Sequence, residues 1–179
     1  DIIGVYRPTA SSVRAGRLVA FSSAVRALDT RVSGRQPGIG EISNVILDGL
    51  GIPADAIAVV GNLTAVTAAA PGYVTAFPRG SGVPDTSNVN VGQGETRAVG
   101  VITKLGRSGG RLGVDLYNFA GAHLLFDVVG YMTGPGSKPE SAGLFVPITP
   151  TRMMDTRHQK VRSWDGWTNQ FALPAPINR

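Results

Sequence analysis

The sequence predicts an all-β fold, an antiparallel two-sheet β-sandwich of the jelly-roll or Ig-like kind with about eight strands per unit. The chain has 24 Gly and 12 Pro among its 179 residues, which leaves little room for long helices. Short apolar or alternating segments recur roughly every ten residues between turn signals, a spacing typical of sandwiches and barrels.

One continuous stretch of the chain carries the pattern of successive strands. The segments are residues 19–28, 42–47, 56–68, 72–78, 88–91, 96–105, 111–119 and 123–132. Gly, Pro and Ser between them favour tight chain reversal. Residues 51–55 are the one place where a short helical turn is expected to start, and no helix longer than about two turns is expected.

Apolar patterning predicts which strands are central. Residues 111–118 alternate in polarity, so one face of this strand should cover the core from one side. The inward set is Leu112, Val114 and Leu116, and the outward set is Gly113, Asp115 and Tyr117. Residues 57–63 and 124–129 are apolar on both faces and should form central or covered strands.

The two ends of the chain are copies of one another. Residues 1–31 align without a gap on residues 127–157, at an offset of 126 residues. The identical pairs are Asp1/Asp127, Gly4/Gly130, Leu18/Leu144, Arg26/Arg152, Asp29/Asp155, Thr30/Thr156 and Arg31/Arg157. The chain is therefore cut out of phase with its own repeating unit.

This repeat divides the chain into five segments. Residues 1–8 correspond to the last strand of a preceding repeat, 9–17 to a linker, 18–132 to a complete β-sandwich repeat, 133–143 to a second linker and 144–179 to the start of the next repeat. Both linkers are rich in small residues, Gly, Pro or Ser, as joints between modules usually are.

The composition excludes several kinds of chemistry. The chain has no Cys, so disulfides, thiolate metal sites and a Cys nucleophile are impossible. Its two histidines are His123 and His158, and no nucleophile, base and orienting residue can be assembled from the sequence. We therefore expect no enzyme, no catalytic residue, no cofactor and no metal site. No apolar run approaches the roughly 18 residues of a membrane-spanning helix.

The net charge of +5 first raises the question of a nucleic-acid partner. The arginines are spread along the chain, without a basic run or interleaved aromatic residues, so a nucleic acid is not expected. A general attraction to acidic cell-wall polymers is the milder inference.

The complete unit carries a set of short strings, and some of them have copies in the two part-copies. They are RALDTR at 26–31 with its copy at 152–157, GIPADA at 51–56, APGYVTAFP at 70–78, SNVN at 87–90, GQ at 92–93 and LLFDVVGY at 124–131. Together they resemble a tandem β-repeat module of secreted and cell-surface actinobacterial proteins. The resemblance implies non-catalytic β-domains that accompany hydrolase or adhesive domains, and an extracellular or cell-surface location.

The repeated Asp-Thr-Arg triplets are the first candidate site. Their side chains could bind a sugar or another polar ligand, but short polar residues at a strand end also accept hydrogen bonds from turn amides and hold the following loop. Asp127 lies in an apolar strand, and we expect Arg26 or Arg31 to join it to the first strand of the unit. The residues expected in structural ion pairs are Asp29, Arg31, Arg26, Asp127, Asp155, Arg157 and Arg152.

Aromatic residues suggest a second candidate site. Trp164 and Trp167 could form a sugar-stacking platform or could cap the core of the next unit, and both interpretations stay open. The loops after Arg31 and Phe77 are further candidate positions for carbohydrate recognition. Tyr73 and Phe77 place aromatic rings on one strand face, which we expect to pack in the core.

The leading hypothesis is a non-catalytic extracellular structural or adhesive repeat module. Because residues 1–6 copy the last strand of the unit, an end segment could lie along the sheet of a neighbouring copy, as in strand addition. The assembly strands would include Asp1, Ile2, Ile3, Val128 and Val129. Other copies or adjacent repeats are the expected partners, with cell-wall polysaccharide as a further candidate. A carbohydrate- or cell-wall-glycan-binding module and a hydrolase accessory domain are the alternatives.

Overall fold

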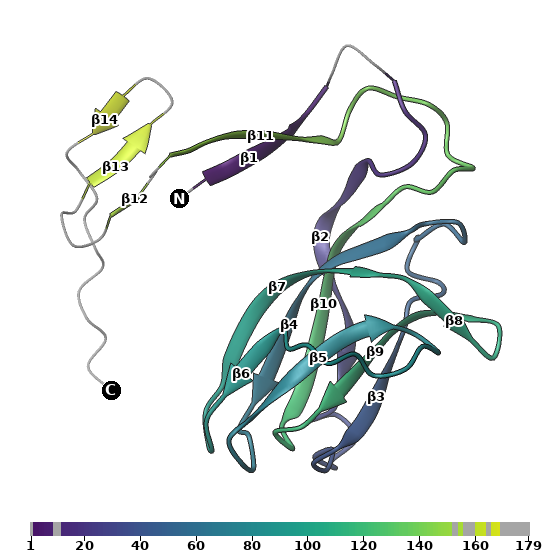
Figure 1. Cartoon of the computed structure of the whole chain (residues 1–179), viewed down its shortest axis with the longest axis vertical. Helices are drawn as coiled ribbons and strands as arrows, with labels where there is room; N and C mark the ends of the chain where they lie inside the picture. Colours follow the sequence, from purple (N-terminus) through teal and green to yellow (C-terminus); the bar gives the residue numbers. More distant parts are fainter. Residues whose placement is uncertain (1, 9–11, 152–153, 156–159, 164–165, 169–179) are drawn as a thin grey trace.

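The computed structural model describes residues 2–8, 12–151, 154–155, 160–163 and 166–168. This part of the chain is built from strands and turns and contains no helix. It therefore offers no helical segment that could cross a membrane. Figure 1 shows a body of packed strands from which a thinner extension leaves at one end.

Two antiparallel sheets form the body. The first has the order β2 (Leu18–Asp29), β10 (His123–Met132), β4 (Ala58–Val66) and β7 (Arg97–Lys104). The second has the order β3 (Glu41–Ile46), β9 (Arg111–Asn118), β5 (Gly72–Pro78) and β6 (Val89–Val91), and β8 (Gly106–Ser108) also pairs with β9. The predicted two-sheet β-sandwich is confirmed.

Each of the eight predicted strands is present, and its ends lie within two residues of the predicted bounds. The additional strand β8 was missed because Gly106 and the following Ser-Gly-Gly indicate a turn. The chain does reverse there, at Gly109 and Gly110, whose φ angles of 58° and 77° lie in the left-handed region that glycine tolerates. The reversal brings the three residues before it alongside β9.

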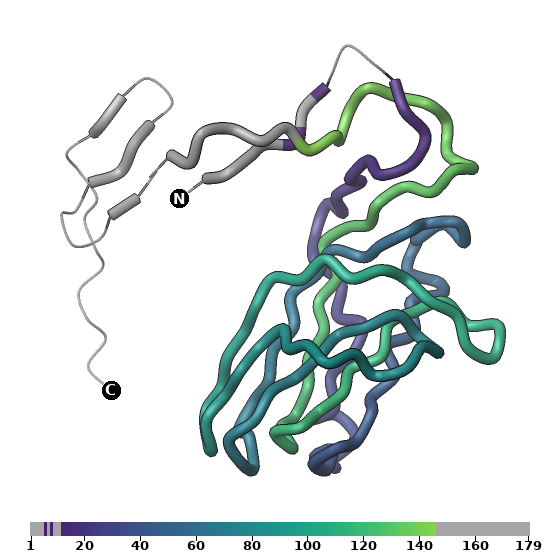
Figure 2. Tube along the Cα trace, in the orientation of Figure 1, coloured from purple at the N-terminus to yellow at the C-terminus, as the bar shows by residue number. Residues whose placement is uncertain are grey.

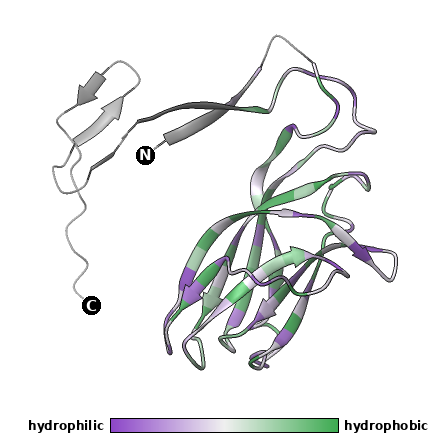
Figure 3. Ribbon diagram, viewed as in Figure 1, coloured by the Kyte–Doolittle hydropathy of each residue, from purple (hydrophilic) through white to green (hydrophobic). Residues whose placement is uncertain are grey.

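The core lies between the two sheets. In β4 the buried residues alternate strictly, with Val59, Leu63 and Ala65 facing the second sheet, which contributes residues such as Val114 and Leu116. β10 and β4 occupy the two central positions of the first sheet, as their apolar sequences predicted. Figure 3 shows the apolar residues concentrated along the strands of the body.

The outward face of β9 differs from the prediction. Asp115 was expected on an open face, but it is only 7% exposed. Its carboxylate accepts hydrogen bonds from Arg79 Nη1 (2.9 Å), Asn44 Nδ2 (2.9 Å) and the Gly80 amide (3.1 Å). Gly113 is also buried, and a Cβ there would lie 3.3 Å from Arg79 Cδ. The segment that follows β5 therefore folds back over this face.

The remaining strands lie outside the sandwich. β1 (Ile2–Arg7) pairs with β11 (Leu144–Thr151) in a two-stranded sheet, and β12 (Met154–Asp155), β13 (Lys160–Ser163) and β14 (Gly166–Thr168) form a three-stranded one. Figure 2 shows how the segments before β2 and after β10 leave the body together at one end.

Candidate functional site

The candidate site begins at the ladder between β2 and β10, the first and last strands of the complete unit. These strands are antiparallel, and Asp127 is the Cα partner of Arg26. The guanidinium of Arg26 binds both carboxylate oxygens, with Nε to Oδ1 at 2.5 Å and Nη2 to Oδ2 at 3.0 Å. This two-point geometry is the strong form of the arginine–carboxylate bond. The carboxylate of Asp127 is thereby tied to the first strand.

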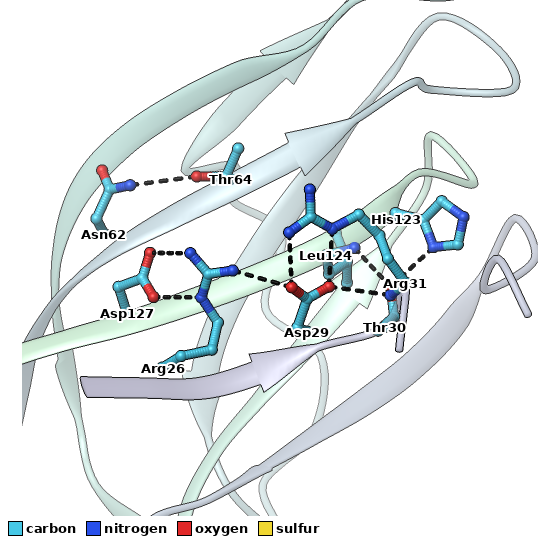
Figure 4. A network of polar contacts seen from close by, with 9 residues as sticks. All are labelled: Arg26, Asp29, Thr30, Arg31, Asn62, Thr64, His123, Leu124 and Asp127. Carbon is cyan, nitrogen blue, oxygen red and sulfur yellow. Dashed lines mark hydrogen bonds and ion pairs between the residues drawn. The ribbon is translucent and has the colours of Figure 1, made fainter. Parts of the chain in front are cut away.

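Arg26 extends this contact into a network with the end of β2 (Figure 4). Its Nη1 donates to Asp29 Oδ2 at 2.9 Å, and Arg31 donates to both oxygens of Asp29 through its Nε and Nη2. The amide of Arg31 also donates to Asp29 Oδ1 at 3.0 Å. The Arg31 side chain, then its amide and Arg26, lower the pKa of Asp29 against an opposing effect of desolvation. A general acid needs a raised pKa, so Asp29 does not suit that role.

Thr30 connects the same strand end to the start of β10. Its hydroxyl accepts a hydrogen bond from the Leu124 amide at 2.9 Å, while its amide donates to the Leu124 carbonyl oxygen at 3.0 Å. The hydroxyl also lies 3.2 Å from His123 Nδ1. His123 begins β10 at this position and lies beside the turn. The Asp-Thr-Arg triplet thus organises a strand end in the way its residue types favour.

The counterparts of this network in the second part-copy are only partly described. Asp155 lies in β12, but its side chain, like Arg152 and Arg157, lies outside the described residues. At the level of the backbone, β11 begins at Leu144 and β12 ends at Asp155. These bounds are the positions of Leu18 and Asp29 shifted by the repeat offset, so β11 begins and β12 ends where a copy of β2 would.

The residues before β2 and after β10 form a clasp, which comprises residues 12–17 and 133–143. Val13 and Glu140 exchange backbone hydrogen bonds of 2.9 and 3.0 Å. Arg17 is 5% exposed and donates to the Val13 carbonyl, to Glu140 Oε2 and to the Lys138 carbonyl, each at 3.0 Å. These segments, predicted as small-residue linkers, are therefore joined to each other at the entrance of the sandwich.

Beyond the clasp, the pairing of β1 with β11 repeats the pairing of β10 with β2. Ile2 is the Cα partner of Thr151. Adding the repeat offset to Ile2 gives Val128, and subtracting it from Thr151 gives Val25. Val128 and Val25 are Cα partners in the β10–β2 ladder. Both ladders are antiparallel, and both are irregular immediately afterwards, at Ile3 and at the 39%-exposed Val129. After this irregularity, the pairing register of the β1–β11 ladder differs by one residue from that of the β10–β2 ladder.

A glycine follows the irregularity in both ladders. A Cβ on Gly130 would lie 2.5 Å from the Val19 carbonyl oxygen of the neighbouring strand, so only glycine allows this approach. Gly4 takes the equivalent place in β1, opposite Pro147. The short Asp-Ile-Ile-Gly and Asp-Val-Val-Gly strings therefore encode the same local bend twice. Asp1, the first residue of that string, lies outside the described residues.

The predicted tryptophan platform cannot be placed as a whole, because Trp164 lies outside the described residues. Trp167 lies in β14, where it is the Cα partner of Arg162, and its side chain is outside the described part. The possible glycan role of these two residues stays a prediction.

Sequence reasoning did not identify Arg17 or the Arg79–Asp115 pair as functional or structural residues. Arg17 and Arg79 are both shielded from water through contacts with residues distant in sequence, which a scan for local motifs does not detect.

Sequence reasoning also placed Tyr73 with Phe77 in the core. Both residues instead lie on the face of β5 that points away from the core, so this prediction is wrong: Phe77 is buried there outside the core cluster, and Tyr73 is half-buried and stacks on Phe119. Within the described residues, no three His, Asp or Glu side chains gather as a metal site.

No family model, no curated protein and no solved structure matches this chain.

Proposed function

We propose that the chain is a non-catalytic extracellular structural or adhesive module, of which neighbouring copies join by pairing a last strand with a first strand. The observation that carries this proposal is the β1–β11 ladder. β1 copies the end of a unit and β11 copies the beginning of one, and they pair antiparallel as β10 and β2 do. The two strands belong to different copies of the repeat, so their pairing links copies through backbone hydrogen bonds.

The clasp supports the same proposal. It holds the entry and the exit of the complete unit side by side, because Arg17 binds Glu140 and the amide of Gly16 donates to the Thr133 carbonyl at 2.9 Å. A unit held in this way leaves the strands on either side free to meet each other. The polar network at the β2–β10 ladder supports a structural role, since its carboxylates are occupied by arginines.

Disulfide trapping tests the strand pairing directly, because the chain has no cysteine of its own. Val5 and Val146 are Cα partners in the β1–β11 ladder. Directly opposite residues of antiparallel strands lie roughly 4.5–5.5 Å apart, which suits a disulfide. We expect the double variant Val5→Cys/Val146→Cys to oxidise nearly completely, either within one chain or between two chains. Non-reducing electrophoresis and mass spectrometry distinguish these products, and both would support pairing between copies.

The matched control keeps Val5→Cys and moves the second cysteine to Ser137, which lies in the clasp. It should form little disulfide under the same conditions. Amide hydrogen exchange of residues 2–7 provides an independent measurement, and we expect protection. Equal disulfide yields in the two variants, together with exchange of residues 2–7 at the rate of an unfolded peptide, would overturn the proposal.

A further inference from the structure

A cluster of aromatic rings lies on the face of the second sheet that points away from the core. Tyr73 of β5 stacks on Phe119, with ring centroids 5.1 Å apart and planes inclined by 23°. Tyr117 of β9 lies 6.2 Å from Tyr73 and 6.4 Å from Phe119. Phe119 is 44% exposed, and the two tyrosines are half-buried. The three rings therefore form a partly solvated aromatic surface rather than a part of the core.

An open hollow of about 260 Å³ lies beside this aromatic surface. It is lined by Tyr73 of β5 and by Asp85, Thr86 and Ser87 of the segment that precedes β6. These three residues are exposed. The volume is below the roughly 300–1,000 Å³ of pockets that enclose drug-sized ligands, so the hollow suits a smaller unit.

The polar wall of the hollow is fixed to the sheet on both sides of Ser87. The Thr75 hydroxyl donates to the Thr86 carbonyl oxygen, and the Asn88 side-chain oxygen accepts a hydrogen bond from the Ala76 amide at 2.7 Å. The Asn88 amide also donates to the Val74 carbonyl oxygen at 3.0 Å. The backbone on both sides of Ser87 is thus held against β5, which lowers the entropy cost of ordering this segment around a ligand.

We propose that this hollow binds one pyranose unit of a neutral saccharide. The CH face of the sugar would pack against the Tyr73 ring, because aromatic faces accept apolar contact while the ligand's edges stay wet. The sugar hydroxyls would donate to the Asp85 carboxylate and would exchange hydrogen bonds with the hydroxyls of Thr86 and Ser87. A pyranose presents an apolar face and a polar edge at the same time, and this combination matches the aromatic and polar groups that line the hollow.

The charge of the hollow selects between saccharide classes. Asp85 is the side chain in the lining that is charged at neutral pH, and it carries a negative charge. A uronic acid or a phosphorylated sugar would meet like-charge repulsion there. No Lys or Arg is among the residues that line the hollow. The inference goes beyond strand pairing and does not depend on it.

The experiment is a titration of the whole chain, followed by backbone amide NMR shifts, with cellotriose, maltotriose and chitotriose as neutral probes and trigalacturonate as the anionic probe. We expect at least one neutral probe to give saturable shifts in residues 73–76, 85–88 and 117–119, with a Kd on the order of 1 mM. Tyr73→Ala should weaken that binding roughly tenfold or more. Ser87→Ala, which leaves the aromatic surface intact, should weaken it roughly threefold.

The matched control is Tyr6→Ala, which removes a 40%-exposed tyrosine of β1, outside the sandwich, and should leave saccharide binding unchanged. The proposal is overturned if none of the neutral probes gives saturable shifts, if trigalacturonate binds as tightly as they do, or if the shifts persist in both Tyr73→Ala and Ser87→Ala. Concentration-dependent shifts in the same residues without any saccharide would instead identify the aromatic surface as a contact between copies, and would also overturn it.

Discussion

The Arg79–Asp115 and Arg26–Asp127 pairs use the same two residue types on opposite sheets, but their surroundings differ. Arg79 and Asp115 have side chains that are 14% and 10% exposed, whereas those of Arg26 and Asp127 are 44% and 21% exposed. Both pairs have short contacts, 2.9 Å and 2.5 Å. The two pairs therefore differ in environment more than in geometry. The free energy of unfolding lost with one partner rises steeply as the other charge becomes shielded from water.

Two features mark the surroundings of the buried pair. A Cβ on Gly106 would lie 2.3 Å from the Arg79 carbonyl oxygen, so glycine lets the chain pass over Arg79. Within the described residues the Nε atom of Arg79 is buried without a hydrogen-bond partner. Asp115 is therefore the main compensation for a guanidinium that has lost much of its contact with water.

The largest expected effect comes from Asp115→Asn, which preserves the side-chain volume but leaves the Arg79 charge unpaired. Breaking a buried pair from one side costs about 3–5 kcal/mol. We expect a loss of this size in the free energy of unfolding, measured by urea denaturation. The double variant Arg79→Met/Asp115→Asn removes the unpaired charge but keeps a side-chain oxygen for the Asn44 and Gly80 donors, and it should recover a large part of the loss. A loss below about 1 kcal/mol in Asp115→Asn would contradict the role of burial.

A smaller effect is expected from Asp127→Asn, which weakens the exposed pair. Partly exposed pairs contribute roughly 1 kcal/mol or less, although two-point arginine contacts are at the upper end. For a chain of this size the melting temperature should fall by about 2–4 °C. Scanning calorimetry under matched conditions measures the change. An unchanged melting temperature would show that the Arg26–Asp127 contact does not stabilise the β2–β10 ladder.

The smallest effect is a change in how stability depends on pH. The pKa of Asp29 is lowered chiefly by Arg31, so its contribution to stability is present above the unfolded carboxyl pKa of about 3.9 and is lost as the pH falls toward the lower folded value. We expect the urea midpoint to be nearly constant above about pH 5 and to fall below about pH 4. Glu41, Asp48 and Glu95 also have lowered pKa values, so Asp29→Asn should reduce this slope without abolishing it. Identical slopes in the two proteins would contradict the effect of Arg31.

The sequence was sufficient to predict most of the fold and the more exposed pair, Arg26–Asp127. Strand positions follow from alternation and turn residues, which are local properties. Arg26 or Arg31 was the predicted partner of Asp127, because an Asp in an apolar strand needs a partner, and the structure shows Arg26 in that place. The end of β2 was predictable for a similar reason, since Asp29 accepts from an amide only two residues away.

The buried Arg79–Asp115 pair could not be predicted in the same way. Arg79 looks like an ordinary residue in a turn, and Asp115 looks like the outward residue of an alternating strand. Their contact depends on how the segment after β5 folds over β9, which no local pattern specifies. The same fold-back places Ser87 beside Tyr73, so the saccharide hollow was outside the reach of sequence reasoning too, although the loop after Phe77 had been named as a candidate position.

The side-by-side entry and exit of the unit have a mechanical consequence. Leu18 and Met132 are Cα partners at the end of the β2–β10 ladder that lies next to the clasp. A force that pulls the two flanking segments apart would act perpendicular to the strands and load one backbone pair at a time, beginning with this one. The β1–β11 ladder and the clasp, with its Arg17–Glu140 contact, would separate first, and the sandwich would then open one residue pair after another. A surface protein built from such units would lengthen in steps under tension and refold when the tension is released.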